Sequence, residues 1–191
     1  MIEFSVQSGS VRKAMLGLRL VLVGGAAAVL GAYACAATAS KPASPAQAKA
    51  TIEARSGSSL TGTATFTEKD GGVDVVVDVS GAPAGTHAVH LHEKGDCSAP
   101  DATSAGGHFN PTNVPHGAPD APQHHAGDFG NMTVGADGKG HLTLHSGMLT
   151  VGPGPGSVIG HAIIVHANAD DMTTQPTGNA GGRIGCGVVS K

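Results

Sequence analysis

Alternation of apolar and polar residues is the sequence feature that most restricts how this chain can fold. Three early segments show it, ATIEAR (50–55), LTGTATFTE (60–68) and GGVDVVVDVSG (71–81), and Asp70-Gly71-Gly72 supplies a hairpin turn between the last two. A period of two places alternate side chains on one face of a strand. No long stretch carries the 3.6-residue apolar period of an amphipathic helix. The chain is therefore predicted to be all-β, a β-sandwich or a flattened barrel.

The later strands are separated by two long segments without strand pattern. Strands are predicted again within 131–151, with Ala136-Asp137-Gly138 as a hairpin turn, within 157–167 and over 184–190. Residues 93–131 and 169–183 are instead rich in glycine, proline, alanine and aspartate. Irregular segments of this length inside a compact domain are usually functional. We therefore expect both segments to carry functional residues.

The first 39 residues have the pattern of a secretory signal peptide. Basic residues precede an apolar run over 20–30, which is too short for a membrane span, and the small-residue stretch AYACAATAS follows. Cleavage is expected either after Ala34, with Cys35 lipidated, or within ACAATA, and an uncleaved anchor is the third alternative. Residues 40–50, SKPASPAQAKA, are predicted to be a disordered linker, and 51–191 the folded domain. The protein is accordingly expected to be periplasmic, and membrane-anchored only if it is a lipoprotein.

Charge and cysteine content restrict the possible partners and the compartment. From Cys35 onward the chain has eight Lys and Arg against thirteen Asp and Glu. This acidic balance leaves no basic stripe to neutralise phosphates, so nucleic acid is not expected as a partner. Cys97 and Cys186 are the only cysteines of the predicted domain. An even pair in an exported chain indicates a disulfide.

Two histidines in the predicted strand HAVHLH indicate a metal site. His90 and His92 are two positions apart, so both rings lie on one face of the strand. An isolated pair of this kind can also belong to a solvated strand face. His166, however, ends another apolar strand. Three or four imidazoles brought together suit copper, because Cu(II) prefers tetragonal nitrogen sets.

A second set of ligands lies in the irregular segment 93–131. Three imidazoles and one carboxylate form a closed tetrahedral set, which suits structural zinc. His108 can belong to both sets, because a deprotonated imidazole can bind a metal through each ring nitrogen. The sequence thus predicts two fused sites: copper at His90, His92, His108 and His166, and zinc at His108, His116, His125 and Asp128. His124 could compete with its neighbour, but the HxGD spacing favours His125.

The motifs that carry these residues resemble those of the copper/zinc superoxide dismutases, in particular the exported bacterial branch. The resemblance covers the chain from about Ala50 to its end, through GTHAVHLHEKGDC, SAGGHFNP, HAGDFGN, IIVHANADD and GNAGGRIGCGVV. It implies a Greek-key β-sandwich, or flattened barrel, with a metal-binding loop and an electrostatic loop. It also implies the two ligand sets above, with Cu(2+) and Zn(2+) as cofactors, and a homodimer or a monomer.

Further roles are implied by the same resemblance. Asp170 resembles the aspartate that links a copper-ligand histidine to a zinc-ligand histidine. Arg183 resembles the arginine that guides and holds the anion beside copper, and His108 the proton donor of the reaction. Cys97 and Cys186 resemble the intrachain disulfide. Asn168 and Pro176 stand where many relatives carry lysines that attract superoxide, so steering is expected to depend largely on Arg183.

The function expected from these residues is disproportionation of the superoxide anion to dioxygen and hydrogen peroxide. The alternative is a non-catalytic periplasmic copper/zinc-binding protein, which the loss of a copper ligand or of the arginine would favour. A zinc hydrolase would need an open position on zinc and a nearby general base. The remaining histidines have structural interpretations. His87 is expected to be packed with its ring hydrogen-bonded, and His141, His145 and His161 to be surface residues of strands.

Overall fold

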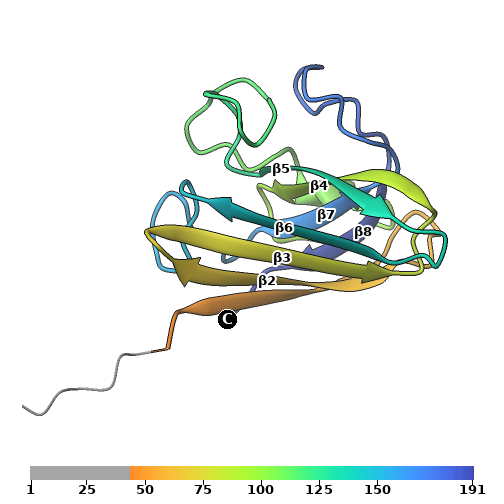
Figure 1. Cartoon of the computed structure of the whole chain (residues 1–191), viewed down its shortest axis with the longest axis horizontal. Coiled ribbons are helices and arrows are strands. Elements are labelled where there is room, and N and C mark those ends of the chain that lie inside the picture. The colour runs from red at the N-terminus through yellow and green to blue at the C-terminus, as the bar shows by residue number, and fades with distance from the viewer. Residues whose placement is uncertain (1–43) are drawn as a thin grey trace, which may run out of the picture. The chain divides into compact units, whose positions relative to one another are not determined.

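Eight antiparallel strands close into a barrel in the computed structural model, which describes residues 44–191 (Figure 1). They are β1 (Gln47–Ala54), β2 (Thr61–Lys69), β3 (Gly72–Ser80), β4 (Gly85–His92), β5 (Asp128–Val134), β6 (Gly140–Ser146), β7 (Ala162–His166) and β8 (Arg183–Val188). Their order around the barrel is β1-β2-β3-β6-β5-β4-β7-β8. The pairings of β3 with β6 and of β4 with β7 are Greek-key crossings. The prediction of an all-β Greek-key fold is confirmed.

Alternation places the core as predicted. Val73, Val75 and Val77 of β3 are fully buried, while the residues between them are partly exposed. The hairpin between β2 and β3 turns at Asp70 and Gly71, whose φ angles of 51° and 80° are both positive, as a type I′ turn requires. Leu149, Val151 and Val158 enter the core from the loop between β6 and β7. The strands predicted within 131–151 and 157–167 are therefore shorter than expected, because loop residues fill part of the core.

The start of β1 corrects the predicted linker 40–50. Residues 47–50 belong to the strand: Ala48 and Ala50 are buried, and Lys49 between them is exposed. Their composition resembled a linker, but alanine is small enough to pack where β1 closes against β2. The signal peptide predicted for 1–39, including Cys35, lies outside the described residues.

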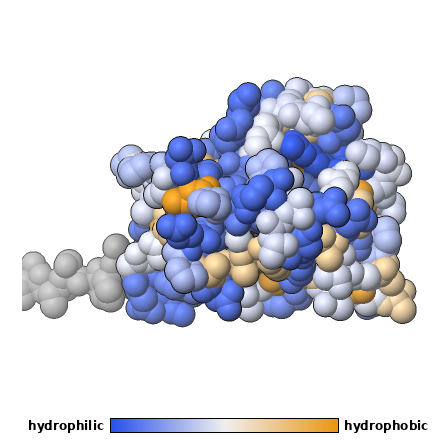
Figure 2. Space-filling view, turned by 90° about the horizontal axis from the view of Figure 1, so that it is seen from above, coloured by the Kyte–Doolittle hydropathy of each residue, from blue (hydrophilic) through white to orange (hydrophobic). Residues whose placement is uncertain are grey.

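The surface of the described domain is mostly polar. The face shown in Figure 2 is largely hydrophilic, with scattered hydrophobic residues. Among residues 44–191 the single exposed large hydrophobic side chain is Val188. None of the helical structure in this part of the chain has the length and hydropathy needed to span a bilayer.

Two long irregular segments meet beside β4, β5 and β7, and they position the candidate site. The first, 93–127, includes one short 3-10 helix, Thr103–Ala105, and the second, 167–182, precedes β8. Both lie at the upper edge of the barrel in Figure 1. Hydrogen bonds between His116 of the first and Asp170 and Gln175 of the second join them. The irregular segments predicted for 93–131 and 169–183 are thus present, over 93–127 and 167–182.

Candidate metal centre

Strand β4 supplies the base of the site. It lies between β5 and β7 in the barrel, and its side chains from His87 to His92 are buried on both faces. Val89 and Leu91 join the hydrophobic core, while His90 and His92 point to the opposite side and are 0% exposed. A β-bridge aligns His92 with His108 and brings the first loop against the strand. One ligand atom of each of four residues thus lies within 4.8 Å of the others: His90, His92, His108 and His166.

Backbone and side-chain acceptors fix which ring nitrogens face the centre of this first set. The Nδ1–H of His92 donates to the carbonyl of Gly106 at 2.9 Å, and that of His166 donates to Gly181 at 3.2 Å. Their Nε2 atoms are left 3.4 Å apart. In His90 the two ring nitrogens have the opposite roles: Nε2–H donates to Asp170 Oδ2 at 2.8 Å, so Nδ1 faces the centre of the set. This second hydrogen bond is typical of metal-ligating histidines.

The second set converges on one carboxylate oxygen. Oδ1 of Asp128 lies 2.8 Å from Nδ1 of His108, 3.0 Å from Nδ1 of His116 and 3.3 Å from Nδ1 of His125. Ligands about 2.0 Å from a tetrahedral zinc ion are themselves separated by roughly 3.3 Å. The other oxygen, Oδ2, accepts the backbone N–H groups of His125 and Gly117, which holds Oδ1 toward the rings.

Three buried ring nitrogens lack a hydrogen-bond partner in the described part of the chain: His90 Nδ1, His108 Nε2 and His116 Nδ1. Such orphans are rare in folded proteins and need an explanation. His116 Nδ1 lies 3.0 Å from Asp128 Oδ1 without hydrogen-bond alignment, as expected of two lone pairs directed at one cation. The donor sets therefore fit metal ions, an imidazole-only set suited to copper and an N₃O set suited to zinc.

Asp170 joins the two sets. Its Oδ2 accepts from His90 of the first set and its Oδ1 from His116 of the second, at 2.8 and 3.0 Å. Asn131 of β5 holds the backbone of Asp170, donating from Nδ2 to its carbonyl and accepting its N–H at Oδ1. The link that was predicted for Asp170 is thus present in the geometry. Sequence reasoning missed Asn131, because a single amide on a strand carries no pattern.

Gly178 has no side chain, and this makes room for the carboxylate of Asp170. Its φ of 65° is in the left-handed region, and a Cβ there would overlap Asp170 Oδ1. We expect Gly178→Ala to displace this carboxylate and weaken metal binding by about 10–100-fold, the usual effect of removing a partner of a ligand. Chelator competition measures the affinity. Gly182→Ala is the matched control, because a Cβ at Gly182 meets no atom within 4 Å. Equal affinities in the two variants would contradict the prediction.

Burial keeps the imidazoles neutral. Desolvation lowers the pKa of His90 and His92 well below the ordinary value, and the neighbouring imidazoles lower it further. Desolvation also lowers the pKa of His166 to about 4. For Asp128 burial acts in the opposite direction, but hydrogen bonds from His108 and from the backbone of His125 and Gly117 lower its pKa to about 2. The four groups are thus deprotonated at neutral pH, as metal ligands must be.

These shifts predict how the stability of the metal-free protein depends on pH. Between pH 4 and 6.5 the unfolded chain binds more protons at His166 than the folded chain does, so the free energy of unfolding rises with pH. Acidification through this window should cost on the order of 3 kcal/mol from His166 alone. Denaturant unfolding of chelator-treated protein at several pH values measures it. His166→Gln should reduce the dependence of the free energy of unfolding on pH. His141→Gln, at an exposed site, should leave this dependence unchanged. A free energy of unfolding that does not change with pH in the native protein would refute the prediction.

Arg183 and the disulfide border the first set. Arg183 begins β8, pairs with His166, and donates from Nη1 to Ala102 and from Nη2 to Gly106, both at 2.6 Å. Gly106 thus accepts from both Arg183 and His92 through one carbonyl. Cys97 and Cys186 form a disulfide with their Cα atoms 5.9 Å apart. The predicted disulfide is confirmed, and it ties the first loop to β8.

Histidines outside the two sets have other surroundings. His87 is buried, with its ring nitrogens hydrogen-bonded to the carbonyls of His166 and Pro83, as predicted. Nδ1 of His124 contacts the carbonyl of His125, and the ring belongs to neither ligand set. His141 and His145 are exposed on β6, also as predicted. The prediction for His161 is wrong: it precedes β7, is partly buried, and stacks on Phe109 with ring centroids 4.0 Å apart.

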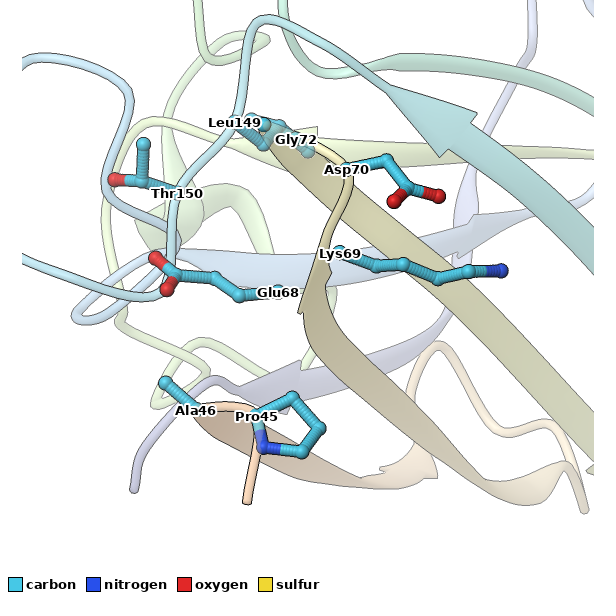
Figure 3. A pocket seen from close by; sticks show the side chains of 9 residues that line it. Pro45, Ala46, Glu68, Lys69, Asp70, Gly72, Leu149 and Thr150 are labelled. Atoms are coloured by element: carbon cyan, nitrogen blue, oxygen red, sulfur yellow. The ribbon is translucent and has the colours of Figure 1, made fainter. Parts of the chain in front are cut away.

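A surface hollow of about 450 Å³ lies beside the β2–β3 turn and includes none of the ligand residues (Figure 3). One oxygen of Glu68 accepts the backbone N–H groups of Val151 and Gly152 there. That carboxylate fastens the loop after β6 to β2. Its role is therefore structural, and the chemistry lies with the histidine sets.

Comparisons with known proteins agree with this site. The family model for copper/zinc superoxide dismutase (SODC) matches residues 60–189. The chain is 45% identical over 140 residues to a superoxide dismutase [Cu-Zn] from Deinococcus radiodurans, covering 68% of this chain and 76% of the relative. The crystal structure of the clock protein EA4 is similar with a TM-score of 0.69 and 36% identity, over 78% of this chain and 96% of that one. The predictions of superoxide dismutase function and of copper and zinc cofactors are confirmed: the chain belongs to the copper/zinc superoxide dismutase family.

Proposed function

We propose that this chain disproportionates superoxide at one fused centre, with copper held by His90, His92, His108 and His166 and zinc held by His108, His116, His125 and Asp128. The observation that carries the proposal is the placement of the His108 ring. Its Nδ1 lies among the second set, and its Nε2 is buried without a partner in the described part of the chain. One imidazole is therefore available to both sets.

Two superoxide anions and two protons give one dioxygen and one hydrogen peroxide. Copper bound by the first set supplies the reversible one-electron chemistry, and zinc in the second set supplies a fixed charge. Arg183 holds the anion beside the first set. His108 takes up a proton at Nε2 and delivers it to the substrate, while Asp170 keeps the rings of His90 and His116 oriented. Each of these roles belongs to a residue of this chain.

The test uses the isolated native protein and its metal derivatives. We expect about one copper and one zinc per chain, the stoichiometry that the two sets imply. In a derivative with oxidised copper and with cobalt in the zinc set, the two metals should couple magnetically through His108. Copper-only and cobalt-only derivatives give the uncoupled reference signals. Independent paramagnetic signals in the mixed derivative would rule out the bridge. Full metal occupancy without disproportionation of superoxide would favour the non-catalytic metal-binding alternative.

We also propose that the protein is exported to the periplasm. The signal-peptide pattern of 1–39 supports this proposal, and so does the Cys97–Cys186 disulfide, since disulfides persist in oxidising compartments. Cell fractionation with mass determination of the mature N-terminus tests it, and separates lipidation at Cys35 from cleavage within ACAATA. An intact N-terminus on cytoplasmic protein would refute export.

A further inference from the structure

Gln175, in the segment 167–182, holds the backbone of the zinc-set residue His116. Its side-chain Oε1 accepts the N–H of His116 at 2.9 Å, and its Nε2 donates to the carbonyl of the same residue at 2.9 Å. Nε2 also reaches the carbonyl of Thr173 at 3.3 Å, which fixes the amide within its own loop. The side-chain amide thus bonds to both polar groups of one backbone unit in the other loop.

These bonds are the only ones that the backbone N–H and carbonyl of His116 make among residues 44–191. His116 lies in an irregular stretch between the 3-10 helix Thr103–Ala105 and β5, so no strand neighbour fixes its position. The residue is nevertheless 4% exposed. Its ring Nε2 donates to Asp170, which lies in the same segment as Gln175. Segment 167–182 therefore holds this ligand at both its backbone and its ring.

The copper set does not depend on this contact. Asp170, the partner of His90, is held separately by the side chain of Asn131. His92 and His166 donate to backbone carbonyls of Gly106 and Gly181. Removal of the Gln175 amide should therefore displace His116, which belongs to the zinc set alone, and leave the four residues of the copper set in place.

We propose that Gln175 is a positioning residue for zinc, and that it makes the zinc affinity depend on the conformation of segment 167–182. The inference rests on the proposed assignment of zinc to His108, His116, His125 and Asp128. Loss of a group that orients a ligand usually weakens metal binding by 10–100-fold. Because Gln175 is exposed and water can partly replace its amide, we expect the lower end, about tenfold.

The experiment compares native protein, Gln175→Ala and the control Gln123→Ala by chelator competition with zinc and, separately, with copper. Gln123 is an exposed glutamine of the same loop as His116. The expected result is about tenfold weaker zinc binding in Gln175→Ala alone, with copper affinity unchanged. Gln175→Glu keeps an acceptor for the His116 N–H but loses the donor to the His116 carbonyl, so it should bind zinc with intermediate affinity. It takes the place of Gln175→Ala if that variant fails to fold.

The zinc-dependent change in amide hydrogen exchange within residues 167–182 supplies a second readout, because a general loss of stability would raise exchange throughout the domain instead. Coupling between two sites is reciprocal, so zinc should slow exchange in residues 167–182 of the native protein, and less so in Gln175→Ala. Equal zinc affinity and equal protection in the two proteins, or equal loss of zinc and copper affinity, would overturn the inference. If the native protein itself takes up no zinc at this set, the proposed function fails instead.

Discussion

Charge reversal at Arg183 is expected to cut the second-order rate of superoxide disproportionation by on the order of tenfold or more while both metals stay bound. From Cys35 onward the chain is acidic, so an approaching anion is repelled at long range and productive capture needs a local positive field. Arg183 is held at the edge of the copper set by the carbonyls of Ala102 and Gly106. Asn168 and Pro176 supply no further positive charge.

The response to salt separates steering from structure. Added salt should slow the native enzyme, because exposed charges are screened over a Debye length of about 8–10 Å near physiological ionic strength. In Arg183→Glu salt should raise the rate instead. Lys69→Glu is the matched control: it changes the net charge equally, at the exposed last residue of β2. Arg183→Lys, which keeps the charge, should retain most of the rate. If Arg183→Glu, at full copper occupancy, has the same rate and the same response to salt as the native enzyme, the residue is only structural.

Removal of the disulfide should have the largest effect on stability. A link between residues 89 positions apart stabilises the fold by about 4–5 kcal/mol in the chain-entropy model. Cys186 lies in a buried apolar cluster with Ala102, Ala105, Ala162 and Ile164, so the double variant to alanine avoids burying a hydroxyl. We expect the unfolding midpoint to fall by roughly 10–20 °C. Calorimetry of native and variant protein, each free of metal, measures it.

Metal retention should fall in the same variant, because Cys97 lies in the loop whose Gly106 carbonyl accepts from both His92 and Arg183. Native protein treated with reductant is the control, since it loses the bond without a change of sequence. Two free thiols in native protein isolated without reductant, or an unchanged midpoint in the variant, would contradict the prediction.

The strands and the ligands could be predicted from sequence because each follows a local pattern. Alternation identified the core valines of β3, and the HxH spacing placed His90 and His92 on one face. The start of β1 was missed, because Ala48 and Ala50 are apolar enough to be buried only in the context of β2. Gln175 and Asn131 were missed for a different reason. Each acts through backbone groups of a residue far away in the chain, and no spacing within the sequence encodes that contact.

The pairing of β4 with β7 implies that the two ligand sets lose their order at different stages of unfolding. Three of the four residues in the copper set lie on these two strands, so folding alone fixes them. Three residues of the zinc set, His108, His116 and His125, lie in the loop 93–127, where ordering of the backbone costs conformational entropy. Zinc binding must supply that ordering free energy, and copper binding largely need not. Warming or mild denaturant should therefore lower the zinc occupancy first, while the histidines of the copper set remain assembled on a folded barrel.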